Sequence, residues 1–293
     1  MAFGSAAKKS NPAKKDFKPT ENIFLDIKRG TRLFRVLGDE IRYKVIWVAK
    51  ESDGTWIPKF GYNPSDRREA RPITVSVFNP ISDDWDGDAY NNPLMQWVND
   101  NFDEDAQKDG KMYPKEQFYV NVMDRTPVKI DAETVYYPDP KNQFPENLKG
   151  IPAKVLNAIK ILQGSSGKVR DEDGDVVGKH LYADLLRVVE GGEVNPDTGN
   201  LLMPHEYDIR LVTTGTGKET ERKFSITANR EVLDLSKVKI YDLRGWLKPY
   251  PTEFMREILL GADFNECLKN YKIKLYPDLV PYMTSTTDDD LPF

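Results

Sequence analysis

The 293-residue chain has little cysteine and histidine: Cys267, His180 and His205 are the whole set. One cysteine excludes an internal disulfide and is typical of a reducing compartment. Three such side chains cannot form a four-ligand zinc site of nitrogen and sulfur. No run of about 18 apolar residues occurs, which excludes a transmembrane helix, and the lysine-rich start lacks the apolar segment of a secretory signal. We expect a cytoplasmic protein that uses no membrane, metal or cofactor.

The chain has little net charge, −5, but its charged side chains are segregated. Residues 1–20 carry five lysines against one aspartate, and residues 284–293 carry three aspartates and no base. Between Asp83 and Asp109 there are nine acidic residues and one lysine. Polar, charged ends with few apolar residues predict a flexible basic arm over 1–20 and a disordered acidic tail over 277–293.

Short runs rich in Val, Ile, Thr and aromatic residues, with turn residues near many of their ends, predict β-strands. The predicted strands cover 31–37, 42–49, 73–78, 117–123, 128–136, 207–213 and 222–228. Apolar residues at helical spacing predict a helix over 151–163, and Thr252 and Asp263 are candidate caps of helices over 252–260 and 263–271.

These elements predict a fold that is mainly β with a few helices (α+β). An OB-fold-type core over 21–250 accommodates them, with large insertions at about 79–112 and 164–204. A helical segment over 251–276 would then lead into the tail.

The predicted strands and their connections interleave cations with aromatic side chains, the combination that binds single-stranded nucleic acid through phosphates and stacked bases. In strand 117–123, alternation places Tyr119 on one face with Gln117 and Asn121. The predicted DNA contacts are Arg35, Tyr43, Lys44, Trp47, Trp56, Lys59, Tyr62, Arg67, Arg68, Tyr119, Arg125 and Tyr137.

The same side chains can instead be explained as parts of the folded core or of a solvated surface, without any role in DNA binding. Aromatic residues of a strand are often core residues, and the sequence does not say which face of a sheet is covered, so both interpretations stay open for Trp47 and Trp56. Arg67 and Arg68 belong to a basic cluster that can equally be a solvated loop.

The last six residues form the sharpest motif of the chain: Asp288, Asp289, Asp290, Leu291, Pro292 and Phe293. Consecutive aspartates repel one another and stay extended, and the final ring lies beside a free carboxylate. Such a peptide suits an apolar pocket with a basic rim on another protein. An ordinary solvated acidic end is the alternative.

This ending resembles the tail of bacterial single-stranded DNA-binding proteins. The body resembles, in order and type of motif, the single-stranded DNA-binding proteins of T-even-like bacteriophages. The residues behind the second resemblance are AKKS at 7–10, RLFRVL at 32–37, SDGTW at 52–56 and QFYVNV at 117–122. The resemblance implies that Lys8 and Lys9 mediate self-association along DNA and that Arg35 faces phosphates. The phage family's zinc ligands are missing, because residues 61–112 contain neither Cys nor His.

We therefore expect a protein without catalytic activity that coats single-stranded DNA in replication, recombination and repair, in the host cytoplasm if it is viral. Its tail would recruit polymerase, primase, helicase or recombination factors. The alternative is a nuclease or recombination mediator of the same machinery. The aspartates at 83–88 could supply its magnesium ligands, but no Lys or His base accompanies them at a set spacing, which favours a solvated acidic loop.

Overall fold

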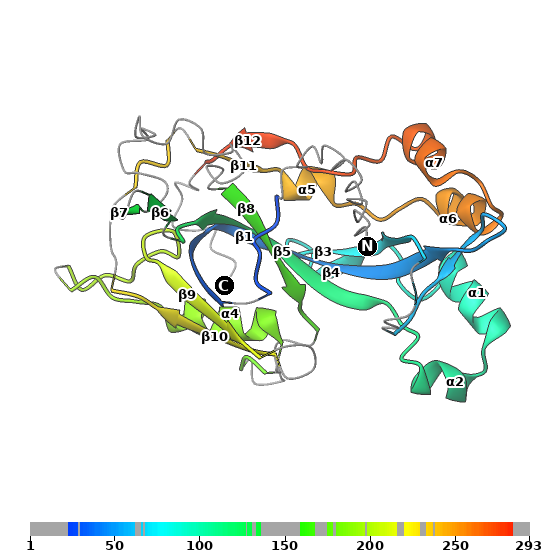
Figure 1. The fold of residues 1–293 in the computed structure, drawn as a ribbon, viewed down its shortest axis with the longest axis horizontal. Coiled ribbons are helices and arrows are strands. Elements are labelled where there is room, and N and C mark those ends of the chain that lie inside the picture. Colours follow the sequence, from blue (N-terminus) through cyan, green and yellow to red (C-terminus); the bar gives the residue numbers. More distant parts are fainter. Residues whose placement is uncertain are drawn as a thin grey trace, which may run out of the picture.

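The structure is a computed structural model. It describes residues 23–28, 30–61, 66, 68–126, 128–130, 133–135, 159–167, 175–177, 180–196, 198–215, 220–228, 233–236 and 238–283. These residues form an open antiparallel sheet with a few helices around it, which confirms the mainly β fold (Figure 1). Within the described part of the chain, no helix is long and apolar enough to cross a membrane.

Strand β1 (Gly30–Lys50) organises the sheet because it pairs along both edges. Its first residues pair with β9 (Ile209–Thr214) and its last with β3 (Ala70–Asn79). The other edge pairs with β5 (Lys115–Asp124) and then with β2 (Trp56–Pro58). A register shift between Leu37 and Ile41, where Gly38 has a φ of 74°, interrupts the pairing with β5. The two strands predicted over 31–37 and 42–49 are thus one strand with a bulge.

The remaining strands extend this arrangement. β10 (Glu221–Ile226) pairs with β9, β4 (Asp84–Asp86) with β3, and β8 (Ile159–Ser165) with β5. β11 (Lys239–Tyr241) and β12 (Leu279–Pro281) form a separate two-stranded sheet. β6 (Val128–Ile130) and β7 (Glu133–Val135) pair as well, where a single strand was predicted.

Two predictions of local structure are wrong. The helix predicted over 151–163 is strand β8 from Ile159 onward, because this segment pairs residue by residue with β5. Residues 151–158 lie outside the described residues. The tail predicted to begin at 277 includes β12, whose pairing with β11 orders the chain there.

Six helices are described: α1 (Pro93–Asn101), α2 (Glu104–Asp109), α4 (Leu181–Gly191), α5 (Leu243–Trp246), α6 (Thr252–Leu259) and α7 (Phe264–Asn270). The two predicted C-terminal helices are confirmed, and Asp263 caps α7 by accepting a hydrogen bond from the Glu266 N–H at 2.9 Å. Thr252 is no cap, because the residue before α6 is Pro251, which makes no side-chain cap. Helix α4 was not predicted.

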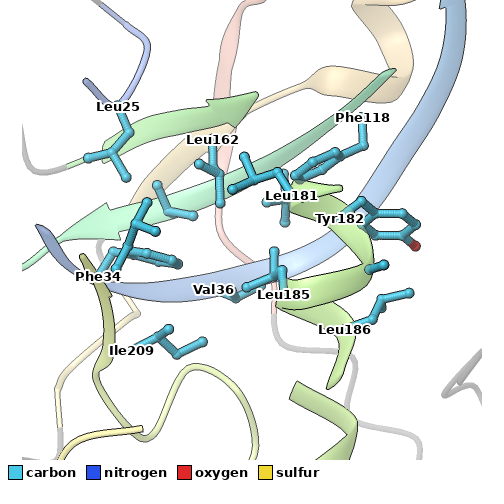
Figure 2. Close-up of a cluster of buried hydrophobic side chains, with 14 of the residues drawn as sticks. Leu25, Phe34, Val36, Phe118, Leu162, Leu181, Tyr182, Leu185, Leu186 and Ile209 are labelled. Carbon is cyan, nitrogen blue, oxygen red and sulfur yellow. The ribbon is translucent and has the colours of Figure 1, made fainter. Parts of the chain in front are cut away.

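Three apolar clusters hold these elements together. In the first, Leu181 and Leu185 of α4 pack on Phe34 and Phe118 of the sheet (Figure 2). In the second, α1, α6 and α7 cover Ile46 and its neighbours on β1 and β3. The third lies on the other face of β1, where residues of β11, α5 and the segment after it cover Tyr43, Val45 and Tyr119. The rest of that face, around Trp47, stays open.

Candidate nucleic-acid interface

An open groove of about 280 Å³ lies at the end of β1, between the segment after β2 and the segment before β5. Trp47 and Tyr113 line it and are 39% and 46% exposed. Phe60 adds a third ring and Lys59 and Lys115 add two ammonium groups. We call these five residues the aromatic groove. Exposed apolar side chains that are gathered in one hollow, unlike single scattered ones, often mark a binding surface.

Backbone pairing sets the position of the groove residues. Trp47 alternates with the buried Ile46 and Val48, so it points away from the core beneath α1 and α6. The Lys59 N–H donates to the Trp47 carbonyl at 2.7 Å, which holds the segment after β2 against β1. Gly61, the last described residue of this segment, has a φ of 74°, a conformation that favours glycine.

The cations of the groove differ in their partners. The Lys115 Nζ lies 3.6 Å from the Tyr113 ring centroid, a cation–π contact. The Lys59 Nζ lies 3.0 Å from the Asp66 carboxylate, which also pairs with Arg68 at 2.9 Å. Arg68 further contacts Glu51. Hydrogen bonds from Arg68, and then from Lys59, hold the pKa of Asp66 well below its ordinary value. Lys59 and Arg68 are therefore neutralised within the protein.

A second group of rings and cations lies on the opposite face of β1. The Arg42 guanidinium lies 3.7 Å from the Phe78 ring centroid, and the Lys44 ammonium lies 4.1 Å from that of Trp85. Tyr90, 58% exposed, lies 5.3 Å from the same ammonium. Lys44 was a predicted DNA contact. The two rings beside its ammonium group, Trp85 and Tyr90, belong to the acidic insertion predicted at about 79–112.

Arg35 and Arg125 are corrections to the predicted DNA contacts. Both side chains are buried, and both approach the buried carboxylate of Asp208, at 2.6 Å and 3.6 Å. Arg35 also donates to the His205 carbonyl at 3.2 Å. In this structure they cannot reach a phosphate, because both are buried against Asp208, the residue before β9.

Tyr43, Trp56 and Tyr119 are corrections too, since all three rings are in the core. Tyr119 stacks on Trp246 with centroids 5.5 Å apart and lies 4.7 Å from Tyr43. Burial raises the pKa of both tyrosines. Trp56 packs on Phe264 of α7 at 4.8 Å.

The burial of Tyr119 has a specific cause. Alternation correctly places it on the face of Gln117 and Asn121, but β11 covers that face. The Asn121 amide both donates to the Tyr241 carbonyl at 2.9 Å and accepts from the Tyr241 N–H at 3.0 Å. This paired contact docks β11 and brings the following helix α5 over the tyrosine.

Of the predicted contacts, Trp47 and Lys59 come together in the aromatic groove, with Arg68 at its rim through Asp66. Sequence reasoning missed Tyr113 and Lys115. An aromatic residue two positions before a lysine, at the entry of a predicted strand, was the available signal. Tyr62, Arg67, Tyr137, Lys8, Lys9 and Asp288–Asp290 with Leu291, Pro292 and Phe293 lie outside the described residues.

No protein-family model matches the chain, no curated protein matches it, and no solved structure matches its fold. Among the residues that the structure describes, no three or more His, Cys, Asp or Glu side chains are grouped so that they could hold a metal ion.

Proposed function

We propose that this chain binds single-stranded DNA without sequence specificity and that the aromatic groove is its principal contact. The observation that carries the proposal is the pair of half-exposed rings, Trp47 and Tyr113, in one groove with Lys115 and with Lys59, whose charge Asp66 offsets. Bases stack on rings whatever their identity, and ammonium groups replace the counterions of the phosphates.

The arrangement of the sheet supports this proposal. A first strand that bulges and pairs along both edges suits a partly open barrel of the OB type, a fold that often binds oligonucleotides on its strands. We propose that the sheet is of that type. The buried rings of Tyr43 and Tyr119 then belong to the core, and the binding face is smaller than the sequence predicted.

The wider role follows from the chain's ends and from the resemblances of its motifs. The protein would coat DNA during replication, recombination and repair. Residues Asp288 to Phe293 would recruit replication enzymes, and Lys8 and Lys9 would contact the next copy along the strand.

The test is a titration of intrinsic fluorescence with oligo-dT, using Trp47→Ala and Tyr113→Ala. Each lost ring removes about 1–3 kcal/mol of stacking per base, so affinity should fall roughly five- to 150-fold. Tyr276→Ala is the matched control, since Tyr276 is 55% exposed and does not line the groove. Equal affinity of all three variants and the wild type would refute the groove as the DNA site.

The same titration examines the alternative role. Quenching that salt reverses, with the oligonucleotide intact, supports a coating protein. Cleavage of the oligonucleotide that requires a divalent metal ion supports the nuclease instead.

A further inference from the structure

A second cleft, of about 620 Å³, lies where the segment after α5 crosses the edge of β3 and β4. Arg42, Arg244 and Lys248 bring three cations to it from β1, α5 and the segment after α5. Phe78, Leu247 and Pro249 supply an apolar floor. No predicted contact falls among these six residues, which we call the basic cleft.

The cations of the basic cleft are less neutralised than those of the aromatic groove. Within the described residues, Lys248 forms no ion pair, and the nearest carboxylate to Arg42 is Glu116, at 3.9 Å. Burial raises the pKa of that carboxyl. Arg244 is paired with Asp39 at 3.1 Å, in an exposed contact of the kind that contributes little.

Two carboxylates also line the cleft: Glu40 is hydrogen-bonded, whereas Asp86 keeps a negative charge that the cations must outweigh. The Glu40 carboxylate accepts a hydrogen bond from the Tyr182 hydroxyl. Asp86 is exposed on β4 and forms no ion pair with a described residue. Arg42 and Lys248 are thus the two cations available to an incoming anion.

The walls of the cleft are held close by the backbone. The Tyr250 N–H donates to the Thr74 carbonyl at 2.8 Å, which fixes the segment after α5 on the edge of β3. Gly87, at a φ of 87°, packs so tightly that a Cβ there would lie 2.8 Å from the Pro249 side chain. A side chain at position 87 would push the two walls apart. The cleft is therefore preformed, as binding sites usually are.

We infer that the basic cleft binds a nucleotide unit of the same DNA strand, with its phosphate on Arg42 and Lys248 and its sugar and base on the apolar floor. The inference rests on the proposed function. Trp47 and Arg42 are five positions apart on β1, roughly 17 Å at the rise of a strand. The two side chains point to opposite faces of β1, so a single strand that engages both sites must cross the edge of the sheet, and the cleft then extends the contact beyond the groove.

The test compares Arg42→Ala/Lys248→Ala with a charge-matched control, Arg256→Ala/Lys269→Ala, on the exposed faces of α6 and α7. Each is titrated with oligo-dT of about four and about twelve nucleotides over a range of salt. The cleft variant should lose affinity for the long strand and keep its affinity for the short one. For the long strand, its slope of log affinity against log salt concentration should be smaller by roughly one to two. The control should keep both.

Two results would overturn the inference. If the cleft variant and the control bind the long strand equally while Trp47→Ala weakens binding, the cleft is no DNA contact and the proposed function stands. A second set of results would point to a mononucleotide site instead: free dTMP binds the wild type but not the cleft variant, and the two proteins bind the long strand equally. Absence of DNA binding by the wild type would instead refute the proposed function itself.

Discussion

The Arg35 Nε lies 2.6 Å from the Asp208 Oδ1, and both side chains are only 1% exposed. This buried ion pair joins β1 to the residue before β9, and Arg125 lies 3.6 Å from the same carboxylate oxygen. Two guanidinium groups around one carboxylate thus tie β1 and the end of β5 to the start of β9.

Arg35→Ala should therefore act on stability. Removing one partner leaves a buried charge poorly compensated, which typically costs about 3–5 kcal/mol of the free energy of unfolding. Urea denaturation measures this cost. If the variant keeps wild-type stability and loses DNA affinity, Arg35 contacts phosphates after all.

Asp66→Asn should strengthen DNA binding. The carboxylate holds Lys59 and Arg68, and its loss frees Lys59 for phosphates and leaves Arg68 with Glu51 as its one carboxylate partner among the described residues. The slope of log affinity against log salt should steepen by roughly one to two. Because the pKa of Asp66 is held well below its ordinary value, the wild type should not show this gain at any pH from 5 to 8.

The control for Asp66→Asn is Glu253→Gln, which makes the same charge change on the exposed side of α6. Equal gains in both variants would mean that only net charge matters. Weaker binding by Asp66→Asn would show that the carboxylate positions Lys59 for its contact.

His205 should make the fold sensitive to mild acid. Burial lowers its pKa, an effect that Glu206 only partly opposes. A folded-state pKa below the unfolded value means that the unfolded chain takes up the proton first, so stability is full above pH 6.5 and is lost as the pH falls from there. Chemical denaturation between pH 7.5 and 5.5 should show this loss, and His205→Asn should reduce it. The same slope in the variant would assign the effect to other groups.

Deletion of residues 288–293 should abolish recruitment of replication enzymes and leave DNA affinity equal or higher, because the acidic run repels phosphates. Pull-down of the partner and titration with oligo-dT measure the two effects. Weaker DNA binding after the deletion would contradict this account of the tail.

Local sequence patterns predicted the strands well, because alternation and turn residues act within a few positions. The segments around β3, β5 and β9 were found, and Asp263 marked the start of α7. Long-range pairing was not predictable in this way. Residues 159–163 have helical spacing, yet pairing with β5 makes them a strand.

The sequence by itself determined on which side of its strand each ring lies: Tyr119 is on the face of Gln117 and Asn121, as alternation requires. Only the tertiary structure decided which rings solvent can reach. Residues 241–247, far along the chain, cover Tyr119, while nothing described covers Trp47 to the same extent. The reason is physical: alternation depends on neighbouring residues, whereas coverage depends on contacts between segments more than a hundred residues apart.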